Sequence, residues 1–400
     1  MSISKQKGGS FMNVSLRDCP AIDVHAHPYV ANTQPFTSDE FVRKLSLAVI
    51  PNQIPDNYKR VQKQPYPGSN MWVQILIQRL AKYFSCEPVL ETVVGARNAK
   101  AENFKKYTRE LFQDAHITGI VGDFGYPQPP LLKQEYAELS GARLWEIYRI
   151  EPVMVRLAEE SDTFGDFIEK YRSELSEALQ QDGIVGLKSI IAYRSGLEIA
   201  PMSKDIAQEE YEQFKKDTRA KVKEFRDYCL HIAMEECTAA NKVMHIHTGV
   251  GDGEVVLPKA SPSFLLDMLR DKKYQETKVH LVHGGYPWVE EVAFIVSILP
   301  NVYMDISLQN PFSGHGVKRI LSQVFEFAPF DKVMYGSDAF TVPEMNWLGV
   351  HLFKECFEEV LGDWVTSDYM DAETARVIGE MVLFRNFENV YQEQLKGAIG

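Results

Sequence analysis

Long apolar runs are missing from this sequence. No stretch of about 18 apolar residues occurs, so we expect no membrane span. The first ten residues, Met1–Ser10, are rich in Lys, Gly and Ser and lack the apolar core of a signal peptide, so we expect no secretion. Cysteine is also scarce, with five residues and no CxxC pair, which excludes a disulfide framework and favours a reducing cytoplasm.

Positive charge is in short supply as well. The 400 residues carry 43 basic and 55 acidic side chains, a net charge of -12 that repels nucleic acids and anionic membranes. We therefore expect a small-molecule substrate and neither of those partners. Internal repeats and low-complexity linkers are absent too, so we expect residues 1–400 to form a single domain, for which a hydrophobic content of 45% provides a large core.

Short β-branched runs alternate with longer amphipathic stretches up to about residue 340, a pattern typical of repeated βα units. One of the stretches between them, Tyr211–Ala240, predicts a long helix. Eight such runs favour a (β/α)8 TIM barrel, an α/β fold, over an open sheet. The runs are Ala21–His25, Ile117–Phe124, Leu144–Ile150, Ile184–Ile191, Lys242–His247, Lys278–His283, Val302–Ile306 and Lys332–Ser337.

Two regions depart from the repeat. Residues from about 30 to 114 form a long stretch of helical pattern after the first strand, which we interpret as an insertion that caps the mouth of the barrel. Residues from about 345 to 400 predict C-terminal helices.

Histidines and one carboxylate stand at the ends of several predicted strands. His25 and His27 share one face of their strand, although an isolated pair of this kind is more often structural than metal-binding. Later strands end in His247, His283 and Asp338. Because the carboxyl ends of all barrel strands face the same way, these side chains are expected to converge. Imidazole and carboxylate ligands suit zinc or a similar divalent metal with a position open for water.

Other residues leave more than one interpretation open. Lys188 lies inside an apolar run, where it could act as a neutral amine, carry a bridging carbamate, or form a salt bridge with an acid. Arg194 and Arg149 could bind a substrate carboxylate or form ordinary ion pairs. His315, in the loop after the seventh strand, could reach the substrate or be solvated.

With these residues placed, the sequence resembles the amidohydrolase superfamily. The similarity is to the amidohydrolase-related (amidohydrolase 2) group, which includes the N-terminal domains of fungal FluG-type and plant nodulin/glutamine-synthetase-like fusion proteins, and we expect a freestanding form of that domain. The motifs that carry the resemblance are Asp23–His27, Gly186–Leu197, His247–Asp252, His283–Pro287 and Tyr335–Asp338.

The resemblance implies a role for each matched position. His25, His27 and Asp338 would bind the first metal, and His247 matches the ligand of the fifth strand. His283 would bind a second metal or polarise the substrate. Lys188 occupies a position that carries a carboxylated lysine in some branches, so the metal count, one or two, stays open. Related barrels often pair, which makes a homodimer an expectation.

Our hypothesis from these residues is a metal-dependent hydrolase that cleaves an amide or related C–N bond of a small carboxylated metabolite. Asp338 would transfer the proton of the attacking water, and His283 would stabilise the oxyanion. Two alternatives stay open. One is decarboxylation or lactone opening at the same metal site, and the other is a catalytically silent metal-binding module.

Overall fold

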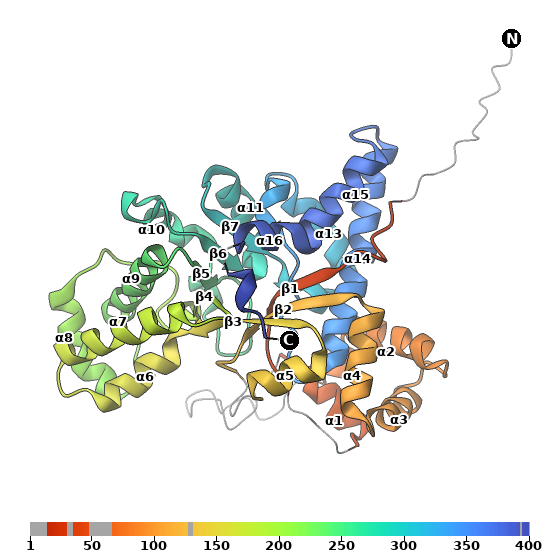
Figure 1. Ribbon diagram of the computed structural model, residues 1–400, viewed down its shortest axis with the longest axis horizontal. Coiled ribbons are helices and arrows are strands. Elements are labelled where there is room, and N and C mark those ends of the chain that lie inside the picture. Colours follow the sequence, from red (N-terminus) through yellow and green to blue (C-terminus); the bar gives the residue numbers. More distant parts are fainter. Residues whose placement is uncertain (1–13, 30–34, 48–65, 127–130, 393, 400) are drawn as a thin grey trace, which may run out of the picture.

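Eight parallel strands stand at the centre of the computed structural model, which describes residues 14–29, 35–47, 66–126, 131–392 and 394–399 (Figure 1). Their order in the sheet follows their order in the chain, and the predicted (β/α)8 barrel is confirmed. In sheet order the strands are β1 (Ala21–Ala26), β2 (Ile117–Asp123), β3 (Arg143–Arg149), β4 (Ile184–Ser189), β5 (Val243–His247), β6 (Val279–Val282), β7 (Val302–Asp305) and β9 (Val333–Met334).

The first and last strands meet and bring the barrel close to closure. Beyond the end of β9, the backbone N–H of Asp338 donates to the carbonyl of His25 at 2.8 Å, and the N–H of Val24 donates to the carbonyl of Tyr335 at 3.0 Å. The ladder with β7 covers only two residues of the last predicted strand. The segment that follows is therefore held by β1, which fixes Asp338 beside the histidines of the first strand.

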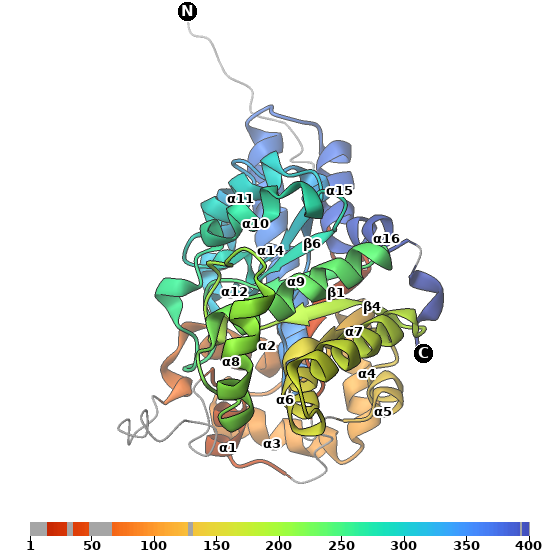
Figure 2. The same ribbon diagram turned by 90° about the vertical axis from the view of Figure 1, so that its left-hand side faces the viewer.

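Close packing between neighbouring strands requires glycine at one position of β4. A Cβ atom on Gly186 would lie 2.1 Å from the carbonyl oxygen of Val243 in β5, so only glycine fits there. In Figure 2, α7 (Phe164–Gln180) and α9 (Lys223–Ala239) lie against β4. The other helices of the barrel are α5 (Lys133–Ser140), α6 (Ile150–Glu160), α8 (Lys204–Lys216), α10 (Leu266–Arg270), α11 (Val289–Ile298), α12 (Gln309–Phe312) and α13 (Val317–Val324).

The predicted continuous helix over Tyr211–Ala240 is wrong, because the chain breaks between α8 and α9. Asp217 adopts an extended conformation, and its carboxylate accepts a hydrogen bond from the N–H of Arg219 at 2.9 Å. The N–H of Ala220 donates to the carbonyl of Asp217 at 2.9 Å. A short acidic side chain that binds the backbone in this way competes with the helix and produces a turn.

The insertion after β1 is helical, as predicted, and lies on one side of the barrel next to α14 (Pro343–Thr366) (Figure 1). The end of α1 reaches the barrel mouth, where the Thr341 hydroxyl donates to the carbonyl of Lys44 at 2.6 Å. Residues 30–34 and 48–65 of the insertion, like Met1–Ser10, lie outside the described residues, so its role as a cap stays a prediction. The insertion helices are α1 (Ser38–Lys44), α2 (Met71–Phe84), α3 (Leu90–Ala101) and α4 (Phe104–Asp114).

The C-terminal helices are also present, and the last of them blocks the amino end of the barrel. After α14 come α15 (Ala372–Glu380), a π-helical turn (Met381–Arg385) and α16 (Asn386–Val390). Phe387 packs against Trp145 of β3 with ring centroids 4.9 Å apart, and Tyr391 stacks on Phe387 at 4.6 Å. These aromatic rings join the apolar residues of the strands in one buried cluster, so the amino end is filled with side chains.

All five cysteines are free thiols, and four of them are buried. Among the described helices, none combines the length and the apolar character that crossing a membrane requires.

Candidate active site

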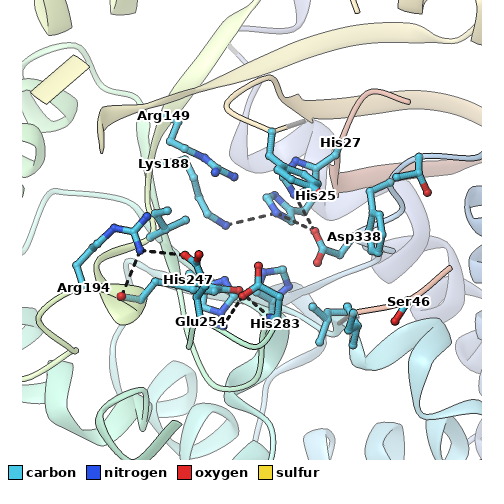
Figure 3. Close-up of a pocket in the computed structure, with 18 of the residues that line it drawn as sticks. His25, His27, Ser46, Arg149, Lys188, Arg194, His247, Glu254, His283 and Asp338 are labelled. Carbon is cyan, nitrogen blue, oxygen red and sulfur yellow. Dashed lines mark hydrogen bonds and ion pairs between the residues drawn. The ribbon is translucent and has the colours of Figure 1, made fainter. Parts of the chain in front are cut away.

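A cavity of about 310 Å³ lies at the carboxyl ends of the strands, and its size suits a small molecule. It brings together every side chain that the sequence predicts as a metal ligand (Figure 3). These side chains are His25, His27, Lys188, His247, His283 and Asp338. They come from five different strands or the residues directly after them, as expected where parallel strands end at one edge.

Three of these residues form a compact group. The ligand atoms of His25, His283 and Asp338 all lie within 4.8 Å of one another, and the three residues are buried. Asp338 Oδ1 is 3.3 Å from His25 Nε2 and 3.1 Å from His27 Nε2. Two imidazole nitrogens therefore face a single carboxylate oxygen. His247 lies beside this group, with its ring centroid 4.4 Å from that of His283.

Neighbouring polar groups orient the rings. His27 Nδ1 donates to the carbonyl of Asp123 at 3.0 Å, so its Nε2 carries the lone pair that faces Asp338. His283 Nδ1 lies 2.8 Å from the Ser307 hydroxyl, which leaves Nε2 for the pocket. Asp338 Oδ1, which faces His25 Nε2 and His27 Nε2, is buried without a hydrogen-bond partner. Oriented nitrogens, one carboxylate and an unsatisfied buried atom fit a divalent cation.

The protonation states also suit metal binding. Burial lowers the pKa of His25, His247 and His283 well below the usual value, and neighbouring positive charge lowers it further. These imidazoles are therefore neutral at pH 7 and can act as ligands. Burial lowers the pKa of Lys188 to about 8, against the attraction of Asp123. Lys188 Nζ lies 3.4 Å from His25 Nε2.

A second group of potential ligands, His25, His27 and Asp123, is less suited to a cation. Asp123 Oδ2 accepts hydrogen bonds from Arg149 at 2.6 and 3.1 Å, and Oδ1 accepts one from the N–H of Gly125 at 2.9 Å. Burial alone would raise the pKa of Asp123, but the neighbouring positive charges, that of Arg149 above all, together hold it below the usual value. The carboxylate is thus already neutralised by an internal partner.

The family model for amidohydrolases matches residues 167–375, which is more than half of the chain. The chain belongs to the amidohydrolase family. It is an enzyme of the amidohydrolase type, and the superfamily resemblance inferred from the strand-end motifs is confirmed. Members of this superfamily depend on metal, and the group of His25, His283 and Asp338 is a candidate metal site in this amidohydrolase.

Known proteins similar to this amidohydrolase differ widely in length and sequence. Protein fluG from Emericella nidulans is 27% identical over 240 residues, which are 56% of this chain and only 28% of fluG. A crystal structure from Lactobacillus casei, described as a metal-dependent hydrolase, is 23% identical with a TM-score of 0.83, and the match covers 96% of this chain and 98% of that one. Glucuronate isomerase from Caulobacter crescentus is 15% identical with a TM-score of 0.63, covering 94% and 92%. The two structures share the fold.

The residues predicted to contact substrate lie in different surroundings. Arg149 and Arg194 both line the cavity. The guanidinium of Arg149 is held by Asp123, whereas Arg194 NH1 lies 3.6 Å from Glu254 Oε2 and 3.3 Å from the carbonyl of Tyr193. His315 is exposed in a short turn, Gly314–Gly316, and is outside the cavity lining. Its contact with substrate therefore stays a prediction without geometric support.

The sequence analysis included Asp23 in a motif but gave it no role, although it joins the first strand to the segment after the last one. Its buried carboxylate accepts hydrogen bonds from the Ser337 N–H at 3.0 Å, the Ser337 hydroxyl at 2.5 Å and the His25 N–H at 3.3 Å. Burial raises its pKa to about 7, against the opposing effect of these bonds. An acid inside an apolar strand is costly unless paired, and this was the available signal.

Arg219 was missed. It lines the cavity from the break between α8 and α9, and its NH1 lies 3.9 Å from Glu254 Oε1. The amphipathic pattern on both sides of the break concealed the turn that places this arginine at the mouth.

Proposed function

We propose that this enzyme hydrolyses an amide or related C–N bond of a small carboxylated metabolite, with a divalent cation, zinc as first choice, bound by His25, His27 and Asp338. The observation that supports this most is the position of Asp338 Oδ1, 3.3 and 3.1 Å from two imidazole nitrogens in a cavity of small-molecule size. A divalent cation in such a site lowers the pKa of water and polarises a carbonyl group.

Asp338 is the proposed proton carrier. Its carboxylate lines the cavity, where it takes a proton from the attacking water and returns it to the leaving nitrogen. General acid–base catalysis of this kind contributes about 10² to 10⁴ in rate. The backbone N–H of Asp338 donates to the His25 carbonyl, which holds the carboxylate in place during both transfers.

His283 stabilises the oxyanion in this proposal, and His247 lies beside it as a further ligand. The Ser307 hydroxyl can donate to His283 Nδ1, in which case Nε2 carries a proton and donates to the developing charge. The same hydroxyl can accept from Nδ1 instead, and Nε2 then becomes a ligand for a second cation. The hydroxyl thus permits both of the roles that the family resemblance implies.

The role of Lys188 depends on the number of cations. Its buried amine has a lowered pKa and lies next to His25. With one cation bound, Lys188 remains an amine that contacts substrate. If two cations were bound, the neutral amine would add to carbon dioxide and lose a proton to give a carbamate, whose oxygens would supply further ligands. Metals per chain, measured by elemental analysis of the purified protein, decide between these states.

The charge of the cavity supports an anionic substrate. Six basic side chains line it against three acidic ones, although the protein as a whole carries a net charge of -12. A positive cavity in a negative protein concentrates small anions at the mouth. Arg194 is the proposed partner of the substrate carboxylate, and Arg149, which Asp123 holds in place, is proposed to line the cavity beside it.

A substrate panel tests this proposal. Zinc-loaded protein would be incubated with N-acyl and N-carbamoyl amino acids, and release of amine would be measured. Asp338→Asn should lower turnover by about 10² to 10⁴ while the thermal unfolding midpoint is retained. Asp331→Asn, which changes an exposed aspartate just before β9, is the matched control and should remain fully active. A fully active Asp338→Asn enzyme contradicts the assignment, and release of carbon dioxide from acids without amine release identifies a decarboxylase.

A further inference from the structure

One carboxylate on the wall of the cavity lies between two arginines. Glu254 Oε2 is 3.6 Å from Arg194 NH1, and Glu254 Oε1 is 3.9 Å from Arg219 NH1. Both distances exceed the roughly 3.2 Å of a good N–H···O hydrogen bond. The carboxylate is therefore near both guanidinium groups, but it forms a short hydrogen bond with neither.

This trio is adjacent to the proposed reaction centre. Arg194 directly follows Tyr193, whose ring centroid lies 4.6 Å from that of His247. Arg219 comes from the break between α8 and α9, and Glu254 comes from the loop after β5. In Figure 3, Arg194 lies to the left of the labelled histidines and Ser46 of the insertion lies to their right. Three separate elements thus build this wall.

A comparison with Arg149 indicates which arginine can exchange its carboxylate partner for a ligand. Asp123, the partner of Arg149, is fully buried and bonded on both oxygens, so it cannot leave. The Glu254 side chain is 22% exposed and stands on a loop, so it can turn towards solvent. An incoming carboxylate that binds both arginines with short hydrogen bonds gains more than the loosely held Glu254 loses.

We propose that Arg194 and Arg219 form the anion subsite of the cavity and that Glu254 occupies it until a ligand carboxylate displaces it. The subsite selects small carboxylates whose anionic group points away from Asp338, towards the ends of β4 and β5. Glu254 acts as an internal competitor, so a neutral ligand of the same size gains nothing at this wall. The inference rests on the proposed function in taking this cavity as the substrate site, although binding requires no turnover.

Calorimetric titration of the zinc-loaded protein with glutarate tests the subsite. Glu254→Gln removes the competing charge and should tighten glutarate binding about fivefold to tenfold, where a tenfold change corresponds to 1.4 kcal/mol. Arg219→Met should weaken it by a similar factor. Glutaramide, which is neutral and of similar size, should bind equally weakly to all variants. Glu198→Gln, which changes an exposed glutamate in the same loop as Arg194, is the matched control and should leave glutarate binding unchanged.

The outcomes separate this inference from the proposed function. Equal glutarate affinity in the parent protein, Glu254→Gln and Arg219→Met would mean that glutarate binds only to zinc, and would overturn the subsite. No glutarate binding to any variant would overturn it as well, even in an enzyme that hydrolyses amides. The expected changes in affinity in a protein that releases no amine would leave the subsite in place and refute the proposed hydrolysis.

Discussion

Two layers of histidines lie inside the barrel, and they differ in the groups that their nitrogens face. In the upper layer, His25 and His27 turn Nε2 towards Asp338, and the ring centroid of His283 lies 5.1 Å from that of His25. In the lower layer, His245 of β5 and His280 of β6 bind other protein groups. Tyr391 Oη lies 3.0 Å from His245 Nε2 and 3.3 Å from His280 Nδ1.

The difference shows that the neighbours of a histidine, and not its place on a strand, decide whether it is available for chemistry. His280 Nε2 is 2.8 Å from Asp305 Oδ2, and the His245 and His280 rings stack with centroids 4.9 Å apart. The layers are also connected, because Asp305 Oδ1 accepts hydrogen bonds from the N–H groups of His283 and Ser307. The lower layer, in which His280 has a polar partner near both ring nitrogens and His245 near one, therefore supports the position of the upper layer.

The largest effect that would test this comparison is expected in the upper layer. His25→Asn removes an imidazole that belongs to both groups of potential ligands, so metal content and turnover should fall together, turnover by about 10³. The free energy of unfolding of the metal-free protein should change by less than about 1 kcal/mol, since the ring has an unsatisfied nitrogen. Elemental analysis, amine release and urea unfolding measure these three quantities.

His116→Asn is the matched control for that change. His116 is exposed and has a positive φ of 57°, a conformation that asparagine tolerates well. Metal content and stability should both stay the same in this variant. Full metal content in His25→Asn would place the cation elsewhere in the cavity.

An intermediate effect is expected in the lower layer, where the free energy of unfolding should change and the metal content should not. Tyr391→Phe removes the hydroxyl that contacts His245 and His280, and should lower the free energy of unfolding by about 1 to 3 kcal/mol because buried ring nitrogens lose a partner. Metal content should stay unchanged. Tyr369→Phe, at a residue that is 75% exposed, is the control and should change stability by less than about 0.5 kcal/mol. Loss of metal in Tyr391→Phe would show that the layers are not separable.

The sequence was sufficient for the barrel and for the upper layer, because buried parallel strands produce continuous apolar runs and ligands follow their ends. Contacts between segments far apart in the chain could not be predicted from the sequence. Asp23 binds Ser337, more than three hundred residues further along the chain, and no local sequence pattern predicts such a bond. Arg219 was concealed because helical periodicity continues on both sides of a turn that one aspartate creates.

The smallest effect is expected for His315, which belongs to neither layer. Its turn packs on the insertion, since a Cβ on Gly314 would lie 3.4 Å from the backbone nitrogen of Trp72 in α2, and the imidazole itself is exposed. His315→Ala should therefore change the free energy of unfolding by less than about 0.5 kcal/mol and leave KM within about twofold. Arg194→Met, measured beside it, should raise KM for a carboxylated substrate about tenfold. A comparable rise in KM for His315→Ala would mean that substrate extends past the upper layer towards α2, and the insertion would then be part of the binding site.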